Sequence, residues 1–490
     1  MLKKLKSKYS ILPIGVKAAL WYTACNVLQK GIAIIVVPIY TRLLTPDNYG
    51  SYSVFMSWAE LFEIIVTFRL FFGAYLVGLV KFEDDQERYT SSLEQLTLMI
   101  TSVFFVLYLI FKEPVNTLTK LTTEQMMLMF LLLITIPVVG FWKSFQRVNN
   151  KYKEMVVAVL GIAILSPLLG ISGILLIEKS ANIVIAARVS SETIVAIILF
   201  ARYAGLFIKK PDVKYWKYAL AINIPLIPYY LSTIILNHSD RIIIQQLVGS
   251  KEAGIYSVAY SAAMVTVLFN TAFDGAIQPW LFRKIKAKEY NEVPGILNFS
   301  LLIVGILNIL LIAFGPEVIK ILAPAPYHEA IWIIPPLASS VFVMYVYIRF
   351  INIEFYYGES KLTGFASIGA AILNVALNFA FIPIFGYLVA GYTTLFSYIA
   401  FGIMHFIYTR KICKKYECPM SMFGIADELK LIALFAATAI LFGAFYKITL
   451  VRYAMILAIM AGCIIKRNEL IEKLKYLTSL KKQAKENNND

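Results

Sequence analysis

The chain has 490 residues, of which 59% are hydrophobic and only 16% are charged. A soluble protein of this length has a large surface, which so few charged side chains could not cover. The aromatic content of 14% argues against a disordered chain, and the formal net charge of +16 would suggest nucleic acid binding only in a soluble protein. The composition therefore predicts a polytopic membrane protein, in which the placement of basic residues sets the topology.

Fourteen apolar segments are long enough to cross a bilayer core of about 30 Å as α-helices. In chain order they cover residues 15–40, 52–79, 93–111, 124–142, 155–177, 183–201, 218–237, 254–276, 296–315, 330–348, 364–383, 388–409, 430–446 and 451–465. An open sheet cannot satisfy its edges in lipid, and uninterrupted apolar runs lack the alternation of a transmembrane barrel. The sequence therefore predicts an all-α polytopic membrane protein with 14 transmembrane helices.

Basic residues are distributed asymmetrically between the loops. When the N-terminus is placed in the cytoplasm, 33 of the 46 Lys and Arg residues fall on the inner side and 9 on the outer side. This bias is the positive-inside signal of membrane proteins. We therefore expect both termini in the cytoplasm and no nucleic acid partner.

The sequence also allows predictions about the two ends of the chain and about the cysteines. The first residues, MLKKLK, indicate a cytoplasmic anchor rather than a signal peptide, because the apolar stretch that follows is too long. Leu470, Leu474 and Leu477 share one face of the basic tail, which fits either a helix on the anionic inner leaflet or a solvated tail. The four cysteines are expected to be reduced thiols.

The chain contains an internal repeat, because a shift of 204 residues aligns 39–57 with 243–261. The identical pairs are Ile39/Ile243, Leu43/Leu247, Gly50/Gly254, Tyr52/Tyr256, Ser53/Ser257, Val54/Val258 and Ser57/Ser261. Gly50 and Gly254 are expected where the chain re-enters a helix, and the six spans between the copies give both halves the same orientation. We expect an N-terminal lobe at 1–208 with helices 1–6, a C-terminal lobe at 209–410 with helices 7–12, and helices 13–14 with a basic cytoplasmic tail at 411–490.

Four segments of the chain resemble one transporter family. They are VPIYTRLLTPDNYGSYSVF (37–55), IPLIPYYLSTIILNHSDRIIIQQLVGSKEAGIYSVAY (224–260), FGPEVIKILAPAPY (314–327) and INIEFYYGESKLTGFASIGAAILNVALNFAFIPIFG (351–386). Their order and spacing are similar to those of the bacterial polysaccharide transporters, the O-antigen and capsule repeat-unit flippases of the multidrug/oligosaccharidyl-lipid/polysaccharide exporter superfamily. One departure is Thr45-Pro46, where Gly-Pro is usual.

The resemblance implies a flippase of the bacterial cytoplasmic membrane. It would move undecaprenyl-diphosphate-linked oligosaccharide repeat units to the outer leaflet by alternating access, for lipopolysaccharide or capsule biosynthesis. The implied partners are the lipid-linked oligosaccharide, membrane lipids, and a polysaccharide polymerase and glycosyltransferases. The alternative is a small-molecule or multidrug antiporter of the same superfamily, whereas the short outer loops disfavour a membrane-embedded glycosyltransferase.

The first span carries a polar face. Thr23, Asn26 and Lys30 fall at i, i+3 and i+7 of one helix. Lys30 lies about 15 Å below the outer turn, too deep to reach the interface easily. A cation facing a cavity would suit a diphosphate or an acidic sugar, and the alternative is a structural ion pair with Glu60 or Glu63 of the second span.

Glu60 and Glu63 share one face of the second span, at i and i+3. They fit counter-charges for Lys30, which we favour, or a site that couples transport to a proton or another ion. Arg69 lies about 120° from Glu63 around a continuous helix, so we expect it to face a different neighbour.

Two further groups of charges lie near the outer ends of spans. Arg188 and Glu192 are spaced i, i+4, so an internal salt bridge is expected. If Arg188 were free, it would be a second substrate anchor, with Glu192 as a coupling residue. Arg42, Asp240 and Arg241 are candidates for a gate or an interfacial ion pair.

The seventh span carries Asn223, Tyr230 and Asn237 along one face. Amides and a tyrosine ring suit sugar hydrogen bonding and stacking, and hydrogen bonds between helices are an equal alternative. The repeat pairs Lys30 with Ile234, so the cation is not duplicated.

No catalytic motif is present in the sequence. The three histidines are scattered, and no glycine-rich loop with GK[ST] occurs. We therefore expect a protein that is not an enzyme, with no catalytic residues, no metal site and no cofactor.

Overall fold

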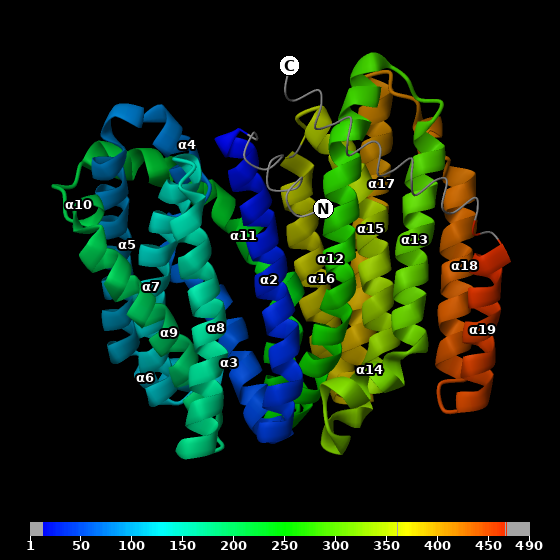
Figure 1. Cartoon of the computed structure of the whole chain (residues 1–490), viewed down its shortest axis with the longest axis horizontal. Coiled ribbons are helices and arrows are strands. Elements are labelled where there is room, and N and C mark those ends of the chain that lie inside the picture. Colours follow the sequence, from blue (N-terminus) through cyan, green and yellow to red (C-terminus); the bar gives the residue numbers. More distant parts are fainter. Residues whose placement is uncertain (1–12, 360, 466, 468–490) are drawn as a thin grey trace, which may run out of the picture. The chain divides into compact units, whose positions relative to one another are not determined.

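The computed structural model describes residues 13–359, 361–465 and 467, so the terminal anchor and the tail helix considered above lie outside the described residues. The described residues contain no β-strand and fold into helices joined by short turns (Figure 1). The helices up to residue 247 are α2 (Ile14–Leu43), α3 (Pro46–Thr67), α4 (Ala74–Lys81), η1 (Glu83–Asp85), α5 (Gln86–Ile110), α6 (Lys112–Thr119), α7 (Thr123–Val148), α8 (Tyr152–Leu176), α9 (Ala181–Arg202), α10 (Ala204–Phe207) and α11 (Val213–Leu247). The remaining helices are α12 (Ser250–Ala287), α13 (Val293–Ala313), α14 (Gly315–Leu322), η2 (Ala325–Ile333), α15 (Ile334–Tyr356), α16 (Lys361–Phe385), η3 (Tyr387–Val389), α17 (Ala390–Lys415), η4 (Met420–Phe423), α18 (Ile425–Ala444) and α19 (Thr449–Ile465).

Within the described residues, 11 helices are long and apolar enough to cross a membrane. The three other expected spans are α3, α18 and α19. Asp47, Glu60 and Glu63 interrupt the apolar character of α3, α18 begins with Asp427 and Glu428, and α19 has only 17 residues. The chain is thus an all-α polytopic membrane protein, and the number of fourteen spans stays a prediction.

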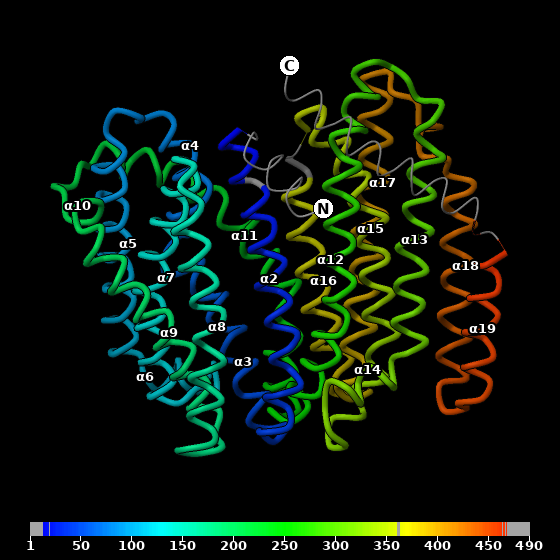
Figure 2. The backbone as a smooth tube through the Cα atoms, in the orientation of Figure 1, coloured from blue at the N-terminus to red at the C-terminus, as the bar shows by residue number. Residues whose placement is uncertain are grey.

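The described chain divides into two compact units, and the division falls within α12, between Gly254 and Ile255. Figure 2 traces the backbone of both units. In the first unit, α9 packs against α7 and α8, α2 packs against α8, and α11 packs against α3, α4 and α5. The lobe boundary expected after residue 208 stays a prediction.

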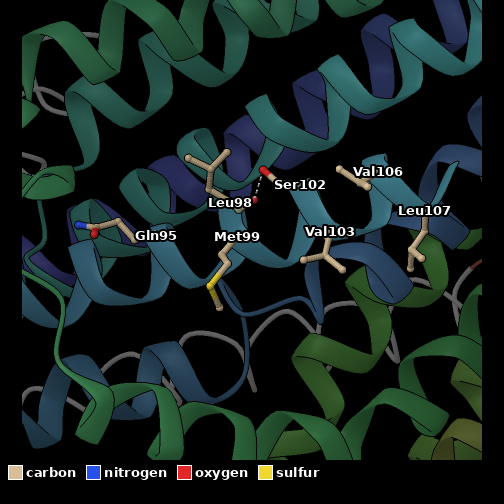
Figure 3. A pocket seen from close by; sticks show the side chains of 7 residues that line it. All are labelled: Gln95, Leu98, Met99, Ser102, Val103, Val106 and Leu107. Atoms are coloured by element: carbon tan, nitrogen blue, oxygen red, sulfur yellow. Dashed lines mark hydrogen bonds between the residues drawn. The ribbon is translucent and has the colours of Figure 1, made fainter. Parts of the chain in front are cut away.

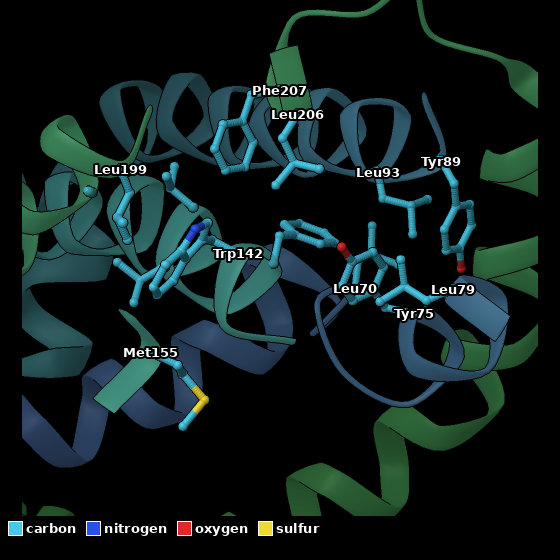
Figure 4. Close-up of a cluster of buried hydrophobic side chains, with 14 of the residues drawn as sticks. Leu70, Tyr75, Leu79, Tyr89, Leu93, Trp142, Met155, Leu199, Leu206 and Phe207 are labelled. Carbon is cyan, nitrogen blue, oxygen red and sulfur yellow. The ribbon is translucent and has the colours of Figure 1, made fainter. Parts of the chain in front are cut away.

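Aliphatic and aromatic side chains form a buried cluster in the first unit (Figure 4). The ring of Tyr75 in α4 stacks on Tyr89 of α5 at 5.6 Å and meets Phe141 of α7 edge-on at 4.8 Å. Tyr89 packs so closely on Gly78 that a Cβ there would lie 2.1 Å from the tyrosine oxygen. These contacts fix the short helix α4 against its neighbours, since buried aromatic pairs contribute about 0.5–1.5 kcal/mol beyond their area.

In the second unit, α15 packs against α13 and α17, α16 packs against α17, and α13 packs against α18. Phe342 of α15 and Phe435 of α18 stack with their ring centres 3.9 Å apart. Arg349, which follows the expected span 330–348 directly, lies within α15 and is 2% exposed. The buried guanidinium is tolerated because Arg349 Nη2 lies 2.6 Å from a carboxylate oxygen of Glu428 in α18.

The turn before α3 has the chemistry of a helix start. The Thr45 hydroxyl accepts a hydrogen bond from a backbone N–H of the first turn, and Pro46 is the first helical residue.

Gly50 and Gly254 lie near the starts of α3 and α12, as expected, and they contact each other. A Cβ on Gly50 would lie 1.7 Å from the Ser250 carbonyl oxygen, so the repeat glycines permit a close backbone crossing.

Candidate functional site

The segment expected as one continuous second span is an interrupted helix. α3 ends at Thr67 and α4 begins at Ala74, and between them Phe68, Arg69 and Gly73 have positive φ values of 50°, 51° and 54°. Each left-handed non-glycine residue costs about 1–2 kcal/mol. Contacts from outside the segment must therefore stabilise the break.

Asn223 of α11 supplies those contacts. Its amide nitrogen donates to the carbonyl oxygens of Phe68 at 3.2 Å and Arg69 at 3.0 Å, and its amide oxygen accepts from the N–H of Ala74 at 3.1 Å. The side chain is fully buried. Both ends of the amide are thus occupied by backbone groups, so Asn223 clamps the helix break. The sugar contact expected at this position from the sequence stays a prediction.

The guanidinium of Arg69 lies at the break, in contact with an acid and two aromatic rings. Its Nε atom is 3.2 Å from a carboxylate oxygen of Glu63. Its central carbon lies 5.3 Å from the ring centre of Phe72 and 5.5 Å from that of Tyr230, within the range of cation–π attraction. Gly73 leaves room for this arrangement, since a Cβ there would lie 2.7 Å from the Tyr230 oxygen.

The expectation that Arg69 and Glu63 face different neighbours was wrong. It assumed a continuous helix, and α3 ends two residues before Arg69. The left-handed turn carries the guanidinium back to Glu63. The expectation that Tyr230 contacts substrate stays a prediction, and the structure places its ring against Arg69.

Glu60 takes part in a second charged group that joins α3 to α11. A carboxylate oxygen of Glu60 lies 3.0 Å from His238 Nε2, and the other ring nitrogen of His238 lies 3.2 Å from Arg241 Nη1. Glu60 and Glu63 therefore have partners in His238 and Arg69, and neither forms the ion pair with Lys30 that the sequence favoured.

Thr23, Asn26 and Lys30 all lie exposed on α2. Lys30 has no ion-pair or hydrogen-bond partner among the described residues, so its charge is not neutralised within the described part of the chain. Its role in substrate binding stays a prediction.

Arg188 and Glu192 form the expected salt bridge within α9, with 2.6 Å between Arg188 Nη1 and a carboxylate oxygen. Two of the gate candidates contact residues of their own helices. Arg241 Nη1 lies 3.2 Å from a ring nitrogen of His238. Arg42 donates to the carbonyl oxygen of Pro38 at 2.8 Å, and Asp240 is buried. The gate therefore stays a prediction.

Asn237 donates to the carbonyl oxygen of Thr233, one turn earlier in α11. A substrate contact at this position stays a prediction.

The hollow of about 590 Å³ in Figure 3 is an outer surface of α5, lined by Gln95, Leu98, Met99, Ser102, Val103, Val106 and Leu107. These mostly apolar side chains come from one helix and fit contact with lipid tails. The described residues also hold no group of three or more His, Cys, Asp or Glu side chains that could bind a metal ion.

Sequence reasoning missed the role of His238 and the partners of Arg69. His238 follows Glu60 by more than a hundred residues, and no local spacing joins the two. The run Phe68 to Gly73 gave one usable signal, because a glycine after several bulky residues inside a span marks a possible break.

Sequence comparison matches this chain to one protein family and to a curated relative. Residues 16–284 match the family described as "Polysaccharide biosynthesis protein". A curated relative, "Lsg locus putative protein 1" of Haemophilus influenzae, is 21% identical over 384 residues, which are 74% of this chain and 89% of that protein.

Two solved structures share the fold. A multidrug resistance MATE family transporter of the MOP superfamily, in an inward-facing conformation, has a TM-score of 0.64 at 13% identity and covers 80% of this chain and 96% of its own. The lipid II flippase MurJ, in an inward closed conformation, has a TM-score of 0.64 at 14% identity and covers 92% of this chain and 100% of its own. The fold of this chain is therefore similar to that of these two membrane transporters.

Proposed function

Because the chain belongs to the polysaccharide biosynthesis protein family and has the fold of MOP-superfamily transporters, we propose that it is a flippase for lipid-linked oligosaccharides. It moves undecaprenyl-diphosphate-linked repeat units across the bacterial cytoplasmic membrane by alternating access, for a surface polysaccharide such as lipopolysaccharide or capsule. One structural relative is a lipid II flippase, which supports a lipid-linked substrate for this chain as well.

The observation that carries this proposal is the interrupted helix with Arg69. Transporters commonly build substrate sites at discontinuous helices, where backbone and side-chain polar groups come together. Here the break holds a guanidinium against the rings of Phe72 and Tyr230, which also contact each other. Aromatic faces pack against the apolar faces of sugar rings, and guanidinium donors suit sugar hydroxyls and phosphate oxygens.

In this proposal the chain crosses the membrane fourteen times, as lobes at residues 1–208 and 209–410 followed by two further helices and the basic tail. Both termini lie in the cytoplasm, in accord with the bias of basic residues toward one side. Glycosyltransferases would build the substrate on the inner leaflet, and a polymerase would use the product on the outer leaflet.

The test is transport of a lipid-linked oligosaccharide in vesicles that contain the purified full-length protein. Arg69→Ala is expected to lower the transport rate about tenfold or more, in line with the 1.5–3 kcal/mol of a hydrogen bond to a charged group. Arg69→Lys should recover only part of the rate, because an ammonium lacks the planar fork of donors. Arg202→Ala is the control, since its side chain is 67% exposed. Absence of transport by the unaltered protein would overturn the proposal.

The alternative is a small-molecule antiporter, and the equal similarity to a multidrug transporter favours keeping it. An antiporter would export drugs from vesicles that contain no lipid-linked sugar. A flippase would leave the drug gradient unchanged under the same conditions.

A further inference from the structure

A second pocket lies inside the first unit, between α2, α3, α8 and α9. Its volume is about 250 Å³. The lining side chains with polar atoms are Gln29 and Tyr40 of α2, Tyr49 and Tyr52 of α3, Ser166 of α8 and Arg188 of α9. Neither Arg69 nor Lys30 lines it, so it is distinct from the helix break.

Four of the polar side chains around the pocket have no hydrogen-bond partner among the described residues. Within the described residues, the amide of Gln29 and the hydroxyls of Tyr40, Tyr52 and Ser166 make no hydrogen bond, and Arg188 donates only to Glu192. None of these four groups has a fully buried polar atom, so each remains accessible. Because a polar group without a partner costs several kcal/mol in an apolar medium, four of them around one hollow indicate a polar occupant.

The charges of the pocket favour a neutral occupant. Glu192 lies 2.6 Å from Arg188 and balances its charge, which leaves the guanidinium as a donor of hydrogen bonds rather than as a net cation. An anion would have to approach the Glu192 carboxylate as well as the guanidinium. A ligand with several hydroxyls gains the same donors without that repulsion.

The aromatic rings and the volume of the pocket further restrict the class of ligand that it can bind. The rings of Tyr40 and Tyr52 stand at 89° with centres 5.9 Å apart. Gly170 leaves space for Tyr40, since a Cβ there would lie 2.2 Å from the tyrosine oxygen. The volume of about 250 Å³ is below the range of about 300–1,000 Å³ for drug-sized ligands, so the pocket admits a single ring and not an oligosaccharide.

We propose that this pocket is a subsite for one neutral, hydroxyl-rich sugar residue. Tyrosine rings would pack on the sugar, while Gln29, Ser166 and Arg188 supply hydrogen bonds. The inference rests on the proposed function, since the sugar would be one unit of the transported oligosaccharide. Under the topology expected from the basic residues, the pocket lies toward the outer ends of α2 and α3, on the side where the substrate leaves.

The first test measures protection of a cysteine placed in the pocket of the full-length protein. Ser166→Cys is labelled with a maleimide in the presence of millimolar glucose, galactose or N-acetylglucosamine, and the unmodified protein gives the background. At least one sugar is expected to slow the labelling several-fold. Gly161→Cys, on the same helix with open space around its Cβ position, is the control and should label at an unchanged rate.

Acidic probes separate the proposed chemistry from an anion site. Inorganic phosphate and glucuronate are expected to protect Ser166→Cys less than the neutral sugars do. Protection by phosphate alone, or equal labelling with and without every sugar, would overturn the proposal.

A second measurement links the pocket to transport. Ser166→Leu fills the pocket and is expected to slow oligosaccharide transport in vesicles about tenfold, equivalent to 1.4 kcal/mol. Ser102→Leu, on the exposed face of α5, is the matched control and should leave the rate unchanged. If the unaltered protein transports nothing, the flippase proposal fails while sugar protection still decides the pocket. If it transports and both Ser166 variants behave like their controls, only the pocket proposal fails.

Discussion

Replacement of Asn223 by alanine is expected to lower the unfolding free energy of the first unit, by an amount that follows from the hydrogen bonds that are lost. The amide makes three backbone hydrogen bonds, but Arg69 O also accepts from Phe72 N at 3.0 Å and keeps that partner. Phe68 O and Ala74 N lose the bond that holds them. The Ala74 N–H is buried and the Phe68 carbonyl is partly buried, so at up to about 1–3 kcal/mol for each unsatisfied group the loss is about 1–6 kcal/mol.

The assay is the thermal unfolding midpoint of the purified full-length protein in one detergent. A loss of 2 kcal/mol corresponds to a fall of at least about 4 °C, taking about 2–4 °C per kcal/mol for a unit of this size. Thr233→Ala is the control on the same helix, because its exposed hydroxyl donates only within α11, to Tyr229 O. Equal midpoints for the two variants would refute the assignment of Asn223 as the clamp.

Three further predictions concern the close helix crossing, a carboxylate outside the spans and the exposed cation of α2. Gly50→Ala should lower the unfolding midpoint, because the added Cβ would lie 1.7 Å from the Ser250 carbonyl oxygen. The control Gly31→Ala has open space around the Cβ and should be neutral or stabilising by up to about 1 kcal/mol. Similar midpoints for the two variants would contradict the close crossing of the helices. Burial would raise the pKa of Glu317, but hydrogen bonds from side chains of α19 hold it below the ordinary value of 4.5. The contribution of the ionised Glu317 carboxylate to stability is therefore complete above pH 4.5 and is lost as the pH falls through the lowered pKa. Glu317→Gln should therefore weaken the dependence of the unfolding midpoint on acidic pH. An unchanged dependence would refute the assigned role of Glu317. Lys30→Ala should block surface polysaccharide production without lowering the protein level, measured by immunoblot and polysaccharide yield; a normal yield would remove Lys30 from the site.

The sequence alone predicted most of the helical fold because the length and apolar character of a span are properties of one continuous segment. Eleven of the expected spans appear as long apolar helices in the described residues, and Gly50 and Gly254 lie near helix starts as the repeat suggested. The break after Thr67 was not predicted. Its segment is as apolar as a span, and it is stabilised by Asn223, which lies about 150 residues further along the chain.

The candidate site was predictable only where its partners share one helix. The pair Arg188–Glu192 follows from the i, i+4 spacing and is present. The pairs Glu60–His238 and Arg69–Tyr230 join α3 or its end to α11, and a single sequence has no local pattern that relates them. Sequence reasoning therefore found the polar residues of the spans but assigned several of them the wrong neighbours.

Among the described residues of the first unit, Arg69 and Arg188 are paired with glutamates and Lys30 is not, and the two kinds of side chain suit different parts of a lipid-linked oligosaccharide. Arg69 and Arg188 each lie within 3.2 Å of a glutamate, so each guanidinium already has a carboxyl partner and contacts a ligand through its remaining donors. Such donors suit sugar hydroxyls. Lys30 has no acidic partner in the described part of the chain, so its full charge would be available to a diphosphate. A neutral oligosaccharide without its lipid diphosphate should therefore lose any dependence on Lys30 while keeping its dependence on the two arginines.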